Sequence, residues 1–174
     1  MNRMVSTDAL SSCSFSIDTP VGACTVISTG DAVVACGFTT DVDRLMMLIH
    51  PSLRPESLKR TVHRSIAEAI TLFFEGEVGA IDAVPVLQCS TPLRELGWRE
   101  LRKVKPGEAI SYGELAKRMD IPRGARAAGQ VCARNPASLF VPCHRIVAAD
   151  GTLNHYLWGL TTKRWLLEFE TVHG

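Results

Sequence analysis

The segment Pro142-Cys143-His144-Arg145 contains the residue types best suited to chemistry in this sequence of 174 residues. A thiol is mostly protonated at neutral pH, so a reactive cysteine needs a group that takes its proton. An imidazole held by a carboxylate is a usual means, because the acid orients the histidine and stabilises its charged form. The segment therefore indicates a nucleophile at Cys143 with His144 as its base. Glu168 and Glu170, near the end of the chain, are the candidate acids.

The run Leu139-Phe140-Val141 before this segment predicts a buried strand. Adjacent strand residues point to opposite faces, so His144 can serve Cys143 only if the strand ends there and the chain turns. After such a turn, a water between the two groups could pass on the proton. Pro142 lacks a backbone donor and fixes the chain, which favours a defined position for the thiol.

The six cysteines are better explained by a reducing compartment than by disulfides. No stretch approaches 18 uncharged apolar residues, which argues against a membrane span, and residues 1–16 lack the pattern of a secretory signal. We therefore expect an intracellular, cytoplasmic protein with reduced thiols. Cys13, Cys24 and Cys89 could join His50 or His63 around a zinc ion, but their irregular spacing favours buried apolar thiols and no metal.

The net charge of +1 conceals an uneven distribution along the chain. Residues 1–89 contain 6 Lys or Arg and 10 Asp or Glu, a balance of −4, whereas residues 90–174 contain 13 and 8, a balance of +5. A basic second half joined to an acidic first half indicates that the second half meets an anionic partner. This modest positive net charge predicts weak, salt-sensitive binding to that partner.

The first half has the pattern of a small α+β domain. Short β-branched and apolar runs, separated by turn signals such as Thr19-Pro20-Val21-Gly22, predict a meander of antiparallel strands. The expected strands are 14–17, 23–28, 32–38 and 80–86, the expected helices are 41–49 and 58–74, and the apolar stripe of the longer helix is Val62, Ile66, Ala69, Ile70 and Phe73. The histidines and acids are scattered, so residues 1–89 are interpreted as a supporting domain.

The second half, residues 90–174, is expected to be a mostly helical domain. Ser90-Thr91-Pro92 predicts an N-cap followed by a first-turn proline for a helix that runs to about residue 103. Ser111 is expected to cap a short helix through Met119, and another helix is expected over 124–134. Two short helices with a tight turn between them have helix-turn-helix proportions, although many such pairs bind nothing. The fold class is therefore α+β.

The helix expected over 124–134 has an almost bare face. Ala125, Ala127, Ala128 and Gly129 surround Arg126. Small residues let a backbone approach another surface closely. That surface is either a DNA groove or another helix of the same protein, and the residues alone favour neither.

Five elements of the second half, in the same order, resemble the O6-alkylguanine-DNA alkyltransferase family. The segment P-C-H-R followed by Ile146-Val147 is similar to the family signature. Ser111 to Ala116 (SYGELA) resembles the first helix of its helix-turn-helix. Arg126 to Gly129 (RAAG) resembles the start of its recognition helix, and Asn135-Pro136 its Asn-Pro turn. Tyr156 through Glu170 resembles its active-site loop and terminal helix.

The resemblance implies a role for each matching residue. Cys143 would be the nucleophile and alkyl acceptor, with His144 as base through a water and Glu170 orienting it. Asn135 would hold the turn before the active-site segment. The remaining implied contacts are with DNA: Tyr112 with the flipped guanine and its phosphate side, Arg126 in the gap that the flipped nucleotide leaves, and Ser111, Ala127, Gly129 and Arg134 along the duplex. The expected substrate pocket consists of Tyr156, Leu157, Trp158 and Ile146.

The implied function is repair of DNA by direct reversal. The protein would flip O6-alkylguanine out of double-stranded DNA and transfer the alkyl group, chiefly methyl, to Cys143 irreversibly and once per molecule. O4-alkylthymine is a second candidate substrate. No cofactor is implied. We expect a monomer in solution, associated with the nucleoid in a bacterium, and leave cooperative binding on DNA open.

Some positions depart from the commonest family pattern. Leu157 and Trp158 stand where small residues are common, which predicts good repair of methyl lesions and poor reaction with benzyl groups. Gln130 replaces a common glycine and would either crowd the groove or contact a phosphate. His155 stands where Gly or Asn is usual. Cys132, in the recognition helix, is a second thiol that is more often explained by packing.

Two other functions use similar residues. A damage-sensing helix-turn-helix protein without chemistry would lack the cysteine that stands at position 143. A cysteine hydrolase of papain type would have a glycine-flanked cysteine motif, which this sequence does not contain.

Overall fold

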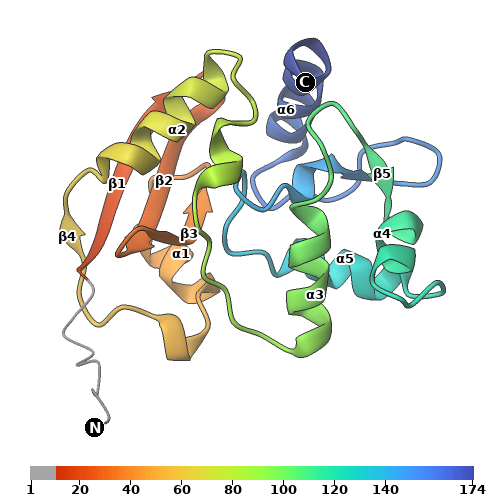
Figure 1. The fold of residues 1–174 in the computed structure, drawn as a ribbon, viewed down its shortest axis with the longest axis horizontal. Coiled ribbons are helices and arrows are strands. Elements are labelled where there is room, and N and C mark those ends of the chain that lie inside the picture. The colour runs from red at the N-terminus through yellow and green to blue at the C-terminus, as the bar shows by residue number, and fades with distance from the viewer. Residues whose placement is uncertain (1–10) are drawn as a thin grey trace, which may run out of the picture.

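The computed structural model describes residues 11–174 and contains one sheet of four strands in its N-terminal half (Figure 1). Strands β1 (Ser12–Thr19), β2 (Gly22–Thr29) and β3 (Ala32–Gly37) form the expected antiparallel meander, and the short β4 (Lys59–Arg60) pairs in parallel with β1. The strand order is β3-β2-β1-β4. The expectation about a secretory signal concerns a segment that begins in residues 1–10, outside the described residues.

A helix covers each face of this sheet. Helix α2 (Arg64–Phe74) buries Ile66, Ile70 and Phe73 in the cluster that contains Cys24 and Val26 of β2. The opposite face packs against α1 (Val42–Leu48), whose buried Leu45 joins Ile27 of β2 and Val34 of β3. The alternation of strand side chains between two faces therefore gives the sheet two apolar sides.

Three predictions about the first half need correction. Helix α2 begins at Arg64 rather than at residue 58, and Val62, placed on its apolar stripe, is 60% exposed. The strand expected over 80–86 is a 3₁₀ helix, η2 (Ala80–Ala83), in which only Ile81 is buried. Val86 forms an isolated bridge with Val33. Another 3₁₀ turn, η1 (Pro51–Leu53), follows α1.

The second half contains the expected short helices. Helix α3 (Pro92–Leu101) has Thr91 as its N-cap, and α4 (Tyr112–Arg118) has Ser111, whose hydroxyl accepts a hydrogen bond from Glu114 N. Helix α5 (Ala125–Ala133) follows a tight turn. Helices α3 and α5 approach closely at Gly97, where a Cβ atom would lie 2.6 Å from Val131 Cγ2.

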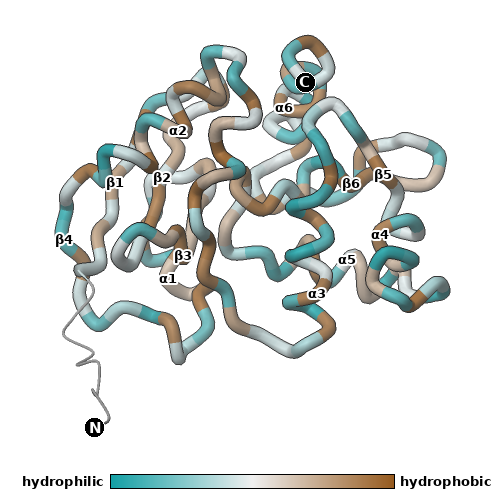
Figure 2. Tube along the Cα trace, in the orientation of Figure 1, coloured by the Kyte–Doolittle hydropathy of each residue, from teal (hydrophilic) through white to brown (hydrophobic). Residues whose placement is uncertain are grey.

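The terminal helix α6 (Leu160–His173) packs against the first half (Figure 1). Phe169 lies 5.8 Å from Phe73 and 6.3 Å from Phe74 of α2 between ring centroids, and Trp165 lies 5.8 Å from Phe74. One core cluster includes residues of both halves. Figure 2 shows apolar residues along β2 and hydrophilic residues along β4. Among the described residues no helix is long and apolar enough to cross a membrane.

The strand predicted over residues 139–141 is wrong. These residues are buried but form a turn, with Leu139 at a φ of 73°. The chain then continues as a 3₁₀ helix, η3 (Cys143–Arg145), into β6 (Ile146–Val147). Strand β6 pairs in parallel with β5 (Ile110–Ser111), a two-stranded sheet that the sequence did not predict.

Candidate active site

Asn135 holds the turn that carries Cys143. Its Nδ2 donates to Val141 O at 2.8 Å and to Cys143 Sγ at 3.3 Å, and its Oδ1 accepts from Ala137 N at 3.0 Å. One buried amide therefore fixes the backbone on both sides of the turn and contacts the thiol itself. Because an amide donor interacts more favourably with a thiolate than with a thiol, Asn135 also favours the charged form of Cys143.

His144 and Arg145 share the carboxylate of Glu170. His144 Nε2 lies 2.8 Å from Glu170 Oε1, while Arg145 donates from Nε to Oε2 at 2.9 Å and from Nη2 to Oε1 at 2.8 Å. All three side chains are buried. Arg145 Nη1 also donates to Val104 O, which ties η3 to the segment after α3. Of the two acids considered from the sequence, Glu170 occupies this site and Glu168 is exposed.

The hydrogen bonds fix the protonation state of this group. Burial alone would raise the pKa of Glu170, but the charges and hydrogen bonds of His144 and Arg145 lower it to about 2. Burial lowers the pKa of His144, so its ring is neutral at neutral pH. An ionised carboxylate only accepts hydrogen bonds, so His144 Nε2 carries the proton and Nδ1 is left as the basic nitrogen. Nδ1 is buried and has no hydrogen-bond partner among residues 11–174.

The chain turns at η3, as it must if His144 is to act on Cys143. Because Cys143 and His144 lie in a 3₁₀ helix rather than in a strand, their side chains are not forced to opposite faces of a sheet. Burial raises the pKa of the Cys143 thiol, and the hydrogen bond from Asn135 and the charge of Lys163 act in the opposite direction. The resting thiol is therefore protonated and needs a base to react.

Lys163 is a site residue that the sequence reasoning missed. It is fully buried in α6, on the same face as Leu166 and Glu170, and its Nζ donates to Ile146 O and to His155 O. It thus links the active-site segment to the loop after it. Burial lowers the pKa of Lys163, while the neighbouring thiols of Cys143 and Cys132 act to raise it. The spacing of three and four residues on one helix face was the available signal.

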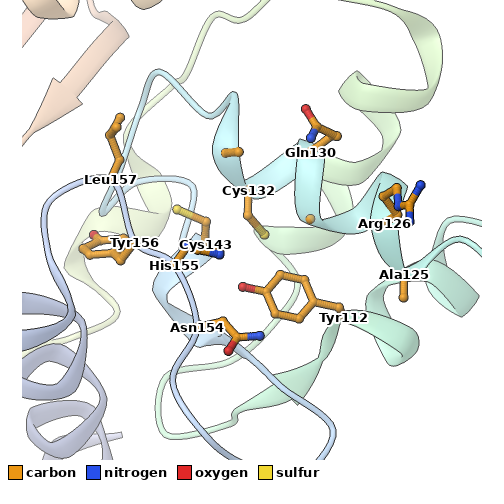
Figure 3. A pocket seen from close by; sticks show the side chains of 12 residues that line it. Tyr112, Ala125, Arg126, Gln130, Cys132, Cys143, Asn154, His155, Tyr156 and Leu157 are labelled. Atoms are coloured by element: carbon orange, nitrogen blue, oxygen red, sulfur yellow. The ribbon is translucent and has the colours of Figure 1, made fainter.

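A cavity of about 670 Å³ opens beside Cys143 (Figure 3). Its walls come from the start of α4, the exposed face of α5 and the loop before α6. The lining residues are Tyr112, Ala125, Arg126, Gly129, Gln130, Cys132, Ala133, Cys143, Asn154, His155, Tyr156 and Leu157. The volume is typical of sites for small organic groups. Burial raises the pKa of Tyr112 to about 12, with a further contribution from Cys132 and Cys143, so its hydroxyl stays a donor.

Two residues expected in the substrate pocket are not part of its wall. Tyr156 and Leu157 line the cavity, but Trp158 and Ile146 do not. Ile146 is fully buried in β6. Trp158 turns away toward the first half of the chain, where its indole packs over Gly37. A side chain that follows a wall residue in an irregular loop need not share its direction, which is why adjacency in sequence misled the prediction.

The residues expected to contact DNA lie on or near the bare face of α5. Arg126 is exposed at the cavity wall, and a Cβ atom on Gly129 would meet no atom within 4 Å. Arg134 is exposed at the end of the helix, and Ala127 is half-buried. Ser111 caps α4.

The bare face of α5 is thus open rather than packed against another helix, except at the buried Ala128. Gln130 and Cys132 of the same helix line the cavity. The described residues contain no group of three or more His, Cys, Asp or Glu side chains that could hold a metal ion, so the zinc site considered from the sequence is not formed by them.

The chain is similar to a well-defined set of proteins. The family described as the DNA-binding domain of 6-O-methylguanine DNA methyltransferase matches residues 92–172. A methylated-DNA–protein-cysteine methyltransferase of Haemophilus influenzae is 31% identical over 153 residues, which are 88% of this chain and 83% of the relative. One of Shigella flexneri is 33% identical over 131 residues, 74% of this chain and 77% of the relative.

A solved structure extends the similarity to the whole fold. The O6-methylguanine methyltransferase of Mycobacterium tuberculosis, crystallised in complex with DNA, superposes with a TM-score of 0.78 at 27% sequence identity. The superposition covers 92% of this chain and 94% of the other. The likeness therefore includes the first half of the chain, where the sequence offered no motif.

Proposed function

The chain belongs to the O6-alkylguanine-DNA alkyltransferase family, the methylated-DNA–protein-cysteine methyltransferases, and from this premise we propose that Cys143 accepts the alkyl group of O6-alkylguanine in DNA. The protein repairs DNA by direct reversal of the damage. The observation that carries the assignment to Cys143 is its position: the thiol lies in the cavity wall with Asn135 on its sulfur and the buried pair of His144 and Glu170 next to it in the chain.

The proposed reaction is a displacement at the alkyl carbon. His144 Nδ1 takes the thiol proton, through a water where the two atoms are not in direct contact, and Glu170 stabilises the imidazolium that forms. The sulfur of Cys143 then bonds to the alkyl carbon while the carbon–O6 bond breaks, and its electron pair stays with guanine. The Tyr112 hydroxyl, in the same cavity, donates a proton to the guanine as it leaves and regains one from the imidazolium of His144, so that both side chains end neutral. Water does not cleave the thioether, so each molecule reacts once.

Access to the lesion depends on the helix-turn-helix. The O6 atom lies inside a base pair, so the nucleotide must leave the stack, at a cost of a few kcal/mol. The bare face of α5 lets the helix approach the duplex closely. Arg126, which is exposed beside the cavity, would fill the gap that the flipped nucleotide leaves. Arg134 and the capped start of α4 at Ser111 would contact the backbone of the same duplex.

The two halves of the chain would divide this work. In the proposed arrangement, residues 90–174 bind DNA and accept the alkyl group, and residues 1–89 support them. The protein would act as a monomer without a cofactor and, in a bacterium, in association with the nucleoid. The side chains proposed for the chemistry, from Asn135 to Glu170, lie entirely in the second half.

Intact mass after incubation with a duplex containing one O6-methylguanine tests the proposal. We expect a gain of one methyl group per protein, abolished by Cys143→Ser and retained by Cys132→Ser, which removes the other thiol of the same cavity. Tight binding with unchanged mass would instead indicate a damage sensor. Repeated turnover without a stable adduct would indicate a hydrolase, and methylation of Cys132 would overturn the assignment to Cys143.

A further inference from the structure

Trp158 is held between the two halves of the chain. Its indole Nε1 donates to Ser138 Oγ at 2.7 Å, and its ring lies over Gly37 at the end of β3. A Cβ atom on Gly37 would lie 2.2 Å from Trp158 Cζ2, so only glycine leaves space for the indole. Strand β3 reaches the second half at this point, because Cys36 N donates to Pro136 O and Ser138 N donates to Cys36 O.

Arg44 of α1 also contacts this loop. Its guanidinium carbon lies 4.8 Å from the centre of the Trp158 ring, and its Nη2 donates to Leu157 O at 3.4 Å. A guanidinium over an indole face is the most favourable form of cation–π contact. Arg44 therefore binds two consecutive residues of the loop, the backbone of one and the ring of the next.

The residue bound through its backbone is part of the cavity wall. Leu157 follows Tyr156 along the wall beside Cys143, as Figure 3 shows. The cavity has to hold the flipped base together with its alkyl group. Selection between small and large alkyl groups then depends on whether the wall near the sulfur can move outward. Contacts behind the wall decide this, and those of Arg44 and Gly37 come from the first half of the chain.

We propose that Arg44 and Gly37 act as positioning residues that restrict the alkyl group to small size, by fixing Trp158 and with it the Leu157 wall of the pocket. The inference rests on alkyl transfer to Cys143. Trp158 acts from behind the wall rather than by occupying the pocket. The first half of the chain, which contains no residue of the pocket wall, thereby takes part in the choice of substrate.

The test compares single-turnover rates on duplexes that contain O6-methylguanine or O6-benzylguanine. In Arg44→Ala the loop loses one partly exposed cation–π contact and a hydrogen bond, so the benzyl-to-methyl rate ratio should rise about two- to fivefold or more. Gly37→Ala displaces the indole, because the added Cβ would overlap it, and should raise the ratio at least as much. Arg44→Lys, which keeps a cation at the ring, should stay near the wild-type ratio.

Arg54→Ala is the matched control, because Arg54 is an exposed arginine of the same half that donates to Ile49 O and contacts no residue of the loop. A general loss of stability lowers the methyl and benzyl transfer rates together and leaves their ratio unchanged. Release of the Leu157 wall changes the benzyl-to-methyl ratio. An unchanged ratio in both Arg44→Ala and Gly37→Ala overturns the inference. If Gly37→Ala does not fold, Arg44→Ala decides alone. A wild-type protein that accepts no methyl group would instead show that the proposed function is wrong.

Discussion

His144 and Glu170 form a hydrogen bond of 2.8 Å in a region that solvent does not reach. The carboxylate belongs to the terminal helix and the imidazole to the segment after the active-site turn. Arg145 occupies the other side of the same carboxylate. The consequence is a neutral imidazole whose proton is fixed on Nε2 and whose Nδ1 is a base. An imidazolium in this position would be stabilised directly by Glu170.

The first prediction concerns the dependence of alkyl transfer on pH. The wild-type rate should be nearly constant at neutral and mildly alkaline pH and fall only as the pH drops through the pKa of His144, which burial holds below 6.5. In His144→Gln the reaction must wait for spontaneous ionisation of Cys143, whose pKa burial raises. The rate at pH 7 should then fall by about 10²- to 10⁴-fold and rise with pH through the alkaline range.

Rapid-quench measurements of methyl transfer from a short duplex give both profiles. DNA affinity measured in parallel should be unchanged in His144→Gln, because the side chain is fully buried. If the methyl-transfer rate depends on pH in the same way in the wild type and in His144→Gln, His144 is not the base.

The second prediction concerns acid stability and Glu170→Gln. The pKa of Glu170 falls from an ordinary value of 4.5 to about 2 in the folded protein, so folding favours its ionised form. The stability it contributes is present above about pH 4.5 and is lost as the pH falls toward 2, to the extent of about 3 kcal/mol. His144 adds a loss that begins as the pH falls below 6.5, because the unfolded chain binds that proton more readily.

Urea unfolding at several pH values separates the two contributions. Glu170→Gln leaves the guanidinium of Arg145, 1% exposed, without its carboxylate. The variant should be less stable at neutral pH by about 3–5 kcal/mol and should lose less further stability between pH 4.5 and 2. Because Glu170 also raises the pKa of His144, the difference between the curves reports Glu170 together with its effect on His144. Equal slopes would contradict the pKa argument.

Patterns with a local cause were predictable from the sequence. The capping hydroxyls of Thr91 and Ser111 located the starts of α3 and α4, because an N-cap needs only the residues of the first turn. The alternating strands of the first half were located for the same reason. The structure places Cys143 in the cavity wall and Glu170 on His144, an arrangement compatible with the roles that the resemblance implied.

Features that depend on distant contacts were not predictable. Three apolar residues at 139–141 read as a strand, but Asn135 folds them into a turn through Val141 O and Ala137 N. The direction of Trp158 depends on the space above Gly37, a residue in another part of the chain. A lysine in a helix also gives no sign of burial by itself, which is why Lys163 was missed.

The third prediction concerns Lys163→Met. The substitution keeps the length and apolar stem of the side chain but removes the donor to Ile146 O and His155 O and the positive charge that lowers the pKa of Cys143. The pKa of Cys143 should rise and methyl transfer at neutral pH should slow. The pH dependence of Cys143 alkylation by iodoacetamide, followed by peptide mass mapping, reports the pKa directly.

Lys103→Met is the control for Lys163→Met, because Lys103 is an exposed lysine of the same half that pairs with Glu100. In Lys103→Met the pH dependence of Cys143 alkylation should match that of the wild type. A profile for Lys163→Met that also matches the wild type, in a folded protein, would show that the ammonium group has only a structural role.

The last prediction concerns Arg126, which is exposed on α5 beside the cavity. If its side chain fills the gap left by the flipped nucleotide, Arg126→Ala should slow methyl transfer from a paired duplex by about ten- to a hundredfold, since stabilisation of the flipped state is worth a few kcal/mol. The same lesion in a single strand needs no extrusion from a base pair and should react at nearly the wild-type rate. Arg134 is an exposed arginine at the end of the same helix. Arg134→Ala should weaken the binding of the duplex and of the single strand alike, and the loss of affinity should be larger at lower salt concentration. An equal slowing of both substrates by Arg126→Ala would assign Arg126 to the phosphate backbone, since a contact with phosphate does not distinguish a paired lesion from an unpaired one.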